Sequence, residues 1–532
     1  MILFIVLATT FFSCYKKDFD KIKLANAQPE YLFPLVDADL SLKDIVDPNK
    51  KQLNITESSD GFYTFIYYQN IFEKFITDLL KIDDVTISQS ISLTNLEGAT
   101  LPVAGTISHD FSQSIVFASA NGEKIKNIRF KSGSIPIRIT SSFKQDIEIQ
   151  ITFPYITKNG VPLSDDIVIH YLGSPSTTFA SNYDLTGYTI DCSENNSTVN
   201  TLSYAAKLIV NYRAGNTIDA SQKIDFNTGL TAINYSYVEG YIGKYDLFIP
   251  QDSVTIGIFN NAYLGSIYFT DPKVRAIITN SIGAPSEVNL NKLRTQSKIN
   301  GQTDIIGTII NTNIPIMYPS LAEVGQKNST TIQLDKTNSN VQTVFNPAPN
   351  KVLYQISGAI NPNGETANFV TDMSSIKVSG EVEIPMEGKI TKLVLLDTLE
   401  GISFPDLNVA GKSVTILSGG FNISLSNGFP MNSNIQMYFI DKQNVIIDSL
   451  FSTPHFIPSA SIDIIGKVTS PSTLIMKELF DADRYNKITH TNRAVLVAQF
   501  STANAGNTPV KIYSSYKIKS NIGLDIKANV SF

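Results

Sequence analysis

Apolar and polar residues alternate along much of the chain. In residues 128–131, 134–139 and 146–151 every second residue is Ile or Phe, and the same period recurs at 253–258 and 375–384. A period of two places successive side chains on opposite faces of a strand, so these segments predict half-buried antiparallel strands. The chain is therefore expected to be all-β, with antiparallel β-sandwich or sandwich-like barrel domains in series and few short helices.

Helical periodicity is scarce. Residues 72–80 carry aromatic and aliphatic side chains on one stripe of a helix, and residues 473–487 hold a second short candidate. We expect both to be plugs or connections between sheets.

The length of 532 residues exceeds the size at which a single core keeps growing, so several domains are expected. The predicted division is a lipoprotein signal peptide at 1–13, a tether and entry segment at 14–54, a first β domain at 55–250 with a polar excursion at 172–200, a second at 251–345 and a C-terminal β domain at 346–532. Residues 495–501, 510–518 and 524–532 are expected to form the strands that close the last sheet.

A short apolar run near the start of the chain ends in a cysteine. Residues 2–12 are apolar or small, and Ser13-Cys14 follows them. The run is too short to span a bilayer but suits a signal peptide. It resembles a bacterial lipobox, which implies cleavage before Cys14 and acylation of its thiol. The missing basic residues and the bulky Phe11-Phe12 pair leave open a plain secretory signal, an apolar N-terminal strand and a start upstream of Met1.

Charge and hydropathy narrow the classes of partner. Charged residues make up 17% of the chain, against about 25% in typical domains, and the net charge is -6. Nucleic-acid binders concentrate Lys and Arg on one face, so nucleic acid is not an expected partner. Beyond the N-terminal run no apolar stretch reaches ~18 residues, and membrane attachment is expected through lipid on Cys14.

Residues that carry catalysis or metal binding are sparse. Cys192 has no histidine near it in sequence and is interpreted as an incidental thiol. The four histidines, at 109, 170, 455 and 490, lack metal-ligand spacing, and no Gly-x-Ser-x-Gly motif occurs. We expect no enzyme activity, no cofactor and no metal.

Tyrosines offer the one candidate ligand site. Tyr63 and Tyr67 lie in one aromatic stretch, and Tyr237 and Tyr241 lie in another. Such rings can stack on a sugar or an apolar ligand, or they can fill sandwich cores. The lack of Trp weakens the case for a glycan platform.

A degenerate hairpin recurs along the chain. A glycine, an alternating strand and a turn occur at 132–143, 264–290 and 418–439, and the second and third of these segments carry Asn in the turn. These hairpins resemble the core of late-embryogenesis-abundant-type and tubular lipid-binding β domains. Further segments resemble a group of large uncharacterised outer-membrane lipoproteins of Bacteroidota, namely residues 31–35, 361–364 with 368–369, 384–388, 397–398 and 509–513. This second resemblance implies placement at the outer membrane and no particular activity.

The sequence favours a non-enzymatic, lipid-anchored cell-envelope protein that acts as a binding, scaffold or accessory component. The alternative is a carrier of lipid or another hydrophobic ligand in an apolar β groove, and a glycan-binding or adhesive surface protein is third. Expected partners are the membrane, through acylated Cys14, and either an outer-membrane protein or a hydrophobic ligand. The periplasmic and surface faces of the outer membrane both remain open.

Overall fold

The computed structural model describes residues 28–531 apart from 43–53, 93–104, 175, 217, 219–220, 258–261, 299, 347–348, 401–403, 405–412 and 492. Cys14 and the signal-like run therefore lie outside the described residues. In the described chain the strands form antiparallel ladders, and helices are short and few. The predicted all-β class is confirmed.

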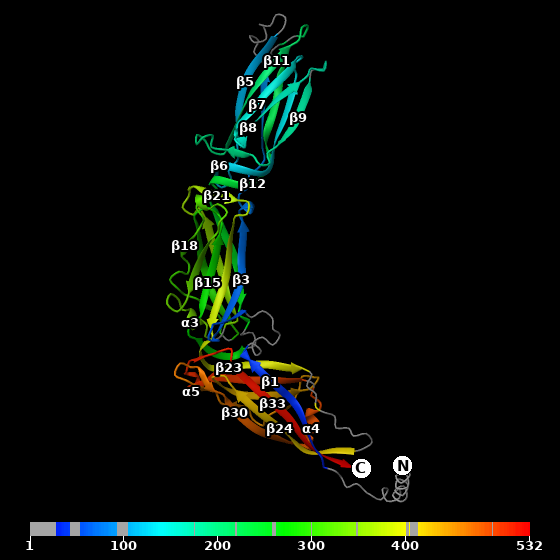
Figure 1. Ribbon diagram of the computed structural model, residues 1–532, viewed down its shortest axis with the longest axis vertical. Coiled ribbons are helices and arrows are strands. Elements are labelled where there is room, and N and C mark those ends of the chain that lie inside the picture. The colour runs from blue at the N-terminus through cyan, green and yellow to red at the C-terminus, as the bar shows by residue number, and fades with distance from the viewer. Residues whose placement is uncertain are drawn as a thin grey trace, which may run out of the picture.

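Three β modules are stacked along the long axis of the molecule (Figure 1). We call them the base, the middle module and the tip. Alternating burial builds each of them: β15, for example, alternates half-buried and buried residues from Lys273 to Asn280. The buried residues of facing sheets form the cores.

The tip is a sandwich with layers β9-β6-β12-β4 and β8-β7-β11-β5, and β10 bridges β6 and β7. Its strands are β4 (Val85–Ser92), β5 (Gly105–Val116), β6 (Lys124–Ser141), β7 (Asp146–Lys158), β8 (Val161–Ile169), β9 (Thr177–Asp184), β10 (Thr189–Asp191), β11 (Thr201–Tyr212) and β12 (Lys223–Tyr241). The expected polar excursion at 172–200 thus contains two paired strands, β9 and β10.

The middle module packs sheet β19-β15-β22-β3-β2 against sheet β13-β20-β16-β17, with β18 beside β16 and β21 beside β12. Its elements are β2 (Asn54–Glu57), β3 (Tyr63–Phe75), η2 (Ile76–Asp78), β13 (Tyr245–Thr255), β15 (Lys273–Asn280), β16 (Ser286–Ser297), β17 (Gly301–Asp304), β18 (Asn313–Ile316), η4 (Leu321–Glu323), β19 (Asn328–Leu334), α3 (Val341–Val344), β20 (Lys351–Ile360), β21 (Asn368–Thr371) and β22 (Ser375–Pro385).

The base packs sheet β1-β33-β24-β30 against sheet β14-β23-β31-β25-β26, in which β27 pairs with β25 and β32 with β23. Its elements are β1 (Glu30–Ser41), β14 (Ala262–Phe269), β23 (Glu387–Glu400), β24 (Ser413–Asn427), β25 (Met431–Ile440), β26 (Ile446–Ser449), β27 (His455–Ile457), β28 (Ser461–Ile462), β29 (Val468–Ser470), β30 (Ser472–Asp481), α4 (Ala482–Ile488), β31 (Arg493–Thr502), α5 (Ala503–Gly506), β32 (Val510–Lys511) and β33 (Lys517–Ser531).

The modules are nested, and this differs from the division expected from the sequence. β22, from the expected C-terminal domain, pairs with β3 of the expected first domain and with β15 of the second. β1 pairs with β33 along its length. The chain rises from the base through the middle module to the tip and then returns, so boundaries at 250 and 345 do not separate the sheets.

Neither candidate helix forms over its predicted range. β3 continues to Phe75 and η2 follows it, while β30 runs to Asp481 before α4 begins. Pairing of β30 with β24 and of β3 with β22 satisfies their backbone groups, and this overrides the helical stripe. α4 begins where the Asp481 carboxylate accepts the backbone N–H of Arg484 at 2.8 Å.

β6 and β12 leave the tip sandwich and extend to the middle module, where the end of β12 pairs with β21. Register shifts in β12 lie between Thr231 and Tyr237, and here Ala232 has a φ of 54°. At a further shift a Cβ on Gly240 would lie 2.3 Å from the carbonyl oxygen of Lys124, so only glycine allows this approach of the strands.

Candidate binding surface on the tip

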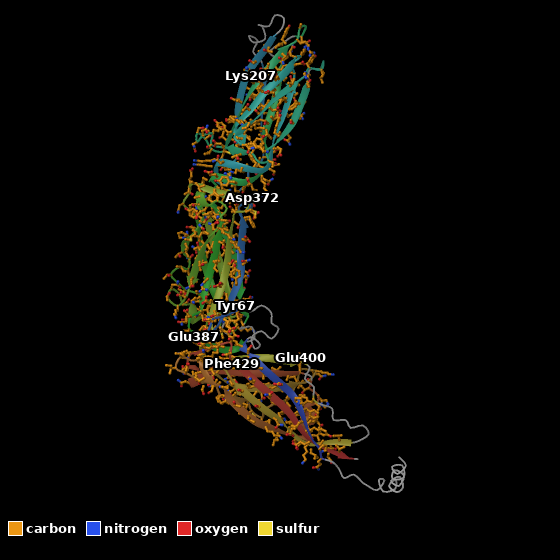
Figure 2. The ribbon with its side chains drawn as sticks, in the orientation of Figure 1. Tyr67, Lys207, Asp372, Glu387, Glu400 and Phe429 are labelled. Atoms are coloured by element: carbon orange, nitrogen blue, oxygen red, sulfur yellow. The ribbon has the colours of Figure 1, made fainter. Side chains whose placement is uncertain are left out.

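Tyr63 and Tyr67, two of the four predicted ligand residues, are core residues of the middle module. They point to the buried face of β3 and are 3% and 8% exposed. Figure 2 shows Tyr67 at the end of the middle module nearest the base. Their rings therefore fill a sandwich core, which is the alternative to ligand contact that the sequence left open.

Tyr237 and Tyr241 lie on β12 at the opposite end of the middle module. The guanidinium of Arg129 lies 4.9 Å from the ring centre of Tyr237, and the ring of Phe369 stacks on it at 6.3 Å. The Tyr237 hydroxyl donates to Glu239 Oε2 at 3.0 Å. Burial, followed by the Glu239 charge, raises the pKa of Tyr237 to about 12.

These contacts give Tyr237 a structural role, because they engage its ring and its hydroxyl within the protein. Tyr241 is half-buried and lies opposite Lys124 in the β6–β12 pair. The four tyrosines are thus split between the two ends of the middle module and do not form one site.

A polar hollow on the outer face of the tip is the stronger candidate. It has a volume of about 450 Å³ and is lined by Asp110, Phe111, Ser112, Gln150, Thr152, Ala205, Ala206 and Lys207. The hollow is shallow and open to solvent. Figure 2 places Lys207 on the tip, far from the base.

The register of three strands builds the hollow. Ala205 on β11 lies between Ser112 on β5 and Thr152 on β7. Two residues further along β11, on the same face, Lys207 lies between Asp110 on β5 and Gln150 on β7. Ala205 carries no side chain beyond Cβ, so it leaves a gap between longer polar neighbours.

Aromatic packing supports the hollow from within. Tyr204, the inward neighbour of Ala205, lies 5.3 Å from Phe226 and 5.8 Å from Phe153 between ring centres. Its hydroxyl donates to Gln89 Oε1 at 3.1 Å, and burial raises the pKa of Tyr204 to about 12. The floor beneath the hollow is therefore closely packed, which favours a preformed surface.

The lining offers both hydrogen-bond donors and hydrogen-bond acceptors, and it carries one negative and one positive side chain. Asp110 brings a carboxylate and Lys207 an ammonium, while Ser112, Thr152 and Gln150 bring hydroxyl and amide groups. Such a set can bind a ligand rich in hydroxyl groups. The sequence analysis missed it, although consecutive alanines within an alternating strand were a usable signal.

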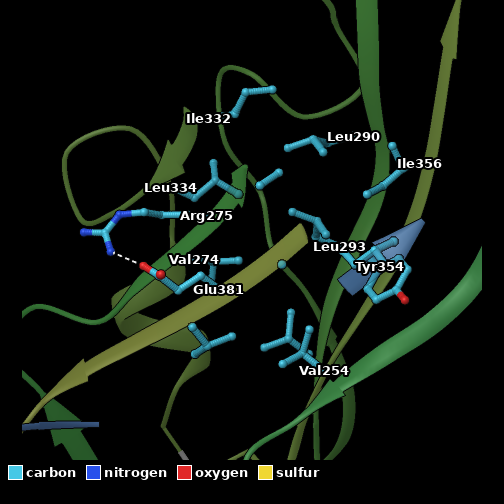
Figure 3. A pocket seen from close by; sticks show the side chains of 15 residues that line it. Val254, Val274, Arg275, Leu290, Leu293, Ile332, Leu334, Tyr354, Ile356 and Glu381 are labelled. Carbon is cyan, nitrogen blue, oxygen red and sulfur yellow. Dashed lines mark hydrogen bonds and ion pairs between the residues drawn. The ribbon is translucent and has the colours of Figure 1, made fainter. Parts of the chain in front are cut away.

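A small cavity lies in the core of the middle module (Figure 3). It measures about 20 Å³ and is lined largely by aliphatic side chains, among them Val254, Leu290 and Leu293. That is room for about one water molecule. This cavity does not suit a lipid chain.

An ion-pair network lies beside this cavity on the outer face of β15 and β22. Arg275 Nη1 donates to Glu381 Oε1 at 2.5 Å and also pairs with Glu383, which Lys273 contacts at 2.8 Å. Burial opposes ionisation of Glu383, but the hydrogen bonds from Lys273 and Arg275 hold its pKa below the usual value. The pairing between neighbouring strands indicates a structural role.

The other residues considered for chemistry are buried or dispersed. Cys192 is fully buried, and burial raises the pKa of its thiol, so the thiolate nucleophile is disfavoured. Within the described residues no group of three His, Cys, Asp or Glu side chains is placed to hold a metal ion. The same residues include no helix long and apolar enough to cross a membrane.

Comparisons with known proteins give distant likenesses. No protein-family model and no curated protein matches the sequence. A crystal structure of a protein from Parabacteroides distasonis described as secreted is 11% identical, covers 93% of this chain and 99% of its own, and has a TM-score of 0.28. The VP2 subviral particle of infectious bursal disease virus is 9% identical, with coverages of 91% and 85% and a TM-score of 0.14. TM-scores this low do not establish a common fold.

Proposed function

We propose that the protein is a non-enzymatic, lipid-anchored component of the bacterial cell envelope that displays a binding module away from the membrane. The observation that supports this proposal is the path of the chain, which starts in the base, rises to the tip and returns to the base. β1 and β33 lie together in the base, whereas the polar hollow lies on the tip at the other end of the stack (Figure 1). A protein held by its N-terminus would present the tip to partners.

Cys14 precedes the first residue of β1 by sixteen residues. That length spans at most about 55 Å when extended. A lipidated Cys14 would keep the base at the membrane, and firm attachment requires more than one acyl chain.

The lining of the hollow favours a carbohydrate as the partner of the tip. Ser112, Thr152 and Gln150 match the donors and acceptors of sugar hydroxyl groups, and Asp110 accepts further hydrogen bonds. A lipid carrier gains no support from the cavity of Figure 3, which is too small for an acyl chain.

Anchoring is tested by metabolic labelling with a palmitate analogue. The parent chain should incorporate the label and sediment with outer membranes, whereas Cys14→Ala should lose the label and become soluble. A parent chain that takes up no label, together with a Cys14→Ala chain that stays as firmly in the membrane fraction as the parent, would remove the anchor from the proposal.

Binding is tested with a panel of purified neutral polysaccharides and two matched variants. Ala205→Arg fills the hollow, and Ala180→Arg places the same side chain at an exposed position on β9, in the other layer of the tip. We expect a polysaccharide to bind the parent and Ala180→Arg alike, and Ala205→Arg to lose at least about tenfold in affinity. Equal losses in both variants, or no binding by the parent, would contradict a carbohydrate site in the hollow.

A further inference from the structure

β1 is the element through which a pull on the proposed anchor enters the fold. It is an edge strand, and within the described residues β33 is its ladder partner, from Glu30 opposite Lys527 to Ser41 opposite Lys517. Figure 1 shows β1 rising from the end of the base near the C-terminus toward the middle module. A pull at Glu30 away from the tip therefore acts along the strand.

β33 is joined to the middle module at its opposite end. The residues just before β33 contact the residues that begin β3. The Ser514 N–H donates to the carbonyl oxygen of Gly61 at 2.8 Å, and the Tyr63 N–H donates to the carbonyl oxygen of Ile512 at 3.1 Å. A load that passes from the base to the middle module through this contact leaves β33 at the end remote from the pull on β1.

Pulling two antiparallel strands from opposite ends shears the ladder between them. Hydrogen bonds of an antiparallel pair run perpendicular to the strands, so a displacement along the strands strains all of them together. Pulling both strands at the same end opens the pairs one after another instead. The ladder of β1 and β33 should therefore resist one direction of pull far better than the other.

Side chains of β1 add to this resistance. Phe33 packs against the base core, and the ring of Tyr31 stacks on it at 6.2 Å. Near the upper end of the strand, Lys517 Nζ donates to Asp39 Oδ2 at 3.2 Å, and Leu42 follows as a buried residue. Sliding of β1 would withdraw these apolar groups from their contacts, which costs free energy beyond the hydrogen bonds.

The same arrangement recurs in the middle module. β3 rises from the base and pairs with β22, from Thr64 opposite Pro385 to Phe75 opposite Ser375. β21, which lies just before β22 in the chain, pairs with β12 at the junction with the tip. A load that enters β3 from the base and leaves β22 toward the tip shears this second ladder as well.

We propose that the ladder of β1 and β33 is a mechanical clamp, which keeps the tip at a fixed distance from the anchor when a bound partner pulls on the tip. The source of the load rests on the proposed function, whereas the directional strength of the ladder follows from its register. The clamp resists a pull between the anchor and the tip. It yields to a pull that separates Glu30 from Lys527, because these residues face each other at one end of the ladder.

Single-molecule force spectroscopy of the full, unacylated chain tests the clamp. One handle is attached to Cys14, and Cys192 takes up none because it is buried. The second handle is attached in one experiment to Lys144→Cys, in the exposed turn between β6 and β7 at the far end of the tip. In the other experiment it is attached to Lys527→Cys, at an exposed position opposite Glu30.

Separation of β1 from β33 is the event to compare between the two experiments. It frees residues 30–53 in both, which is about 80 Å of contour length and identifies the step. We expect the rupture force to be at least about twofold higher with the handle at Lys144→Cys than at Lys527→Cys, because shear loads the whole ladder at once. Equal forces, or a lower force between anchor and tip, would overturn the clamp.

A charge reversal at the remote end of the ladder separates shear from opening pair by pair. Asp39→Lys removes the ion pair with Lys517, at the end that shares the load in shear but opens last when Glu30 is pulled from Lys527. It should lower the rupture force between anchor and tip and leave the force that starts the other opening unchanged. The matched control is Asp166→Lys, at an exposed position on β8 of the tip, which should alter neither force.

An equal fall of both forces with Asp39→Lys would contradict loading in shear. The forces are measured without lipid or carbohydrate, so they are independent of the proposed function. A failed labelling or binding experiment would leave the directional strength of the ladder standing, and equal rupture forces would leave the anchor and the hollow untouched.

Discussion

Glu123 ties the tip to the middle module through one buried carboxylate. Its Oε2 accepts the backbone N–H of Asn121 at 2.7 Å and the hydroxyl of Ser119 at 2.9 Å. Its Oε1 accepts the hydroxyl of Tyr245, on β13, at 3.0 Å. The side chain is 7% exposed, and hydrogen bonds at both oxygens hold its pKa below the ordinary 4.5 despite the opposing effect of burial.

Glu123→Gln should destabilise the protein by about 1–3 kcal/mol at pH 7, because charge-assisted hydrogen bonds are lost. A carboxylate with a lowered folded pKa contributes its full stability above the unfolded value of 4.5 and loses it as pH falls through the folded value. The difference between the two proteins should therefore shrink below pH 4.5. Denaturant unfolding of both proteins as a function of pH measures it, and a constant difference down to pH 3 would contradict this account.

Ala232 holds a left-handed backbone where β12 changes register. Its φ is 54°, and its N–H donates to Asp84 Oδ1 at 2.7 Å. This conformation costs a residue with a Cβ about 1–2 kcal/mol. Ala232→Gly should raise the free energy of unfolding by roughly 0.5–1 kcal/mol.

The control for Ala232→Gly is Ala180→Gly in the extended strand β9, which should lower stability because glycine weakens strands. Calorimetry of both variants measures the effect. A lower unfolding temperature for Ala232→Gly would show that the left-handed backbone at this position carries no strain.

At the scale of elements, β33 organises the base. It lies between β1 and β24, and it buries Leu524, Ile526, Ala528 and Val530. This strand joins β1, the first described strand, to β24, so the sheet forms only once residues 517–531 are present.

Leu524→Ala should destabilise the base by about 2–5 kcal/mol, and deletion of residues 522–532 should expose an apolar sheet face and cause aggregation. Leu32→Ala on the exposed face of β1 should cost less than about 0.5 kcal/mol. Solubility and chemical denaturation measure these effects. A soluble, cooperatively unfolding deletion variant would contradict the central place of β33.

Period-two patterns identified strands such as β7 and β22 because one face of each is buried. The apolar stripe at 473–487 predicted a helix, but most of these residues form strand β30. Leu474 and Met476 pack against the base core, while Ile475 and Leu479 face outward. The pattern of neighbouring residues contains no information about a partner strand some fifty residues away. The sequence could not decide between the core and ligand interpretations of Tyr63 and Tyr67 for the same reason, since pairing decides which face of β3 is inside.

At the scale of the whole molecule, stacking of three modules makes an elongated particle (Figure 1). A compact chain of this length would have a radius of gyration of about 24 Å. Small-angle scattering of the Cys14→Ser chain should give a clearly larger value for the monomer, and a value near 24 Å would contradict the stack.

The sequence by itself determined the class of the fold, because burial of one sheet face imposes a period of two on neighbouring residues. It also indicated that Cys192 is an incidental thiol and placed the candidate anchor at Cys14. The tertiary structure alone decided the nesting of the modules and the hollow around Ala205. These depend on which strands pair and in what register, and such contacts join residues tens to hundreds of positions apart.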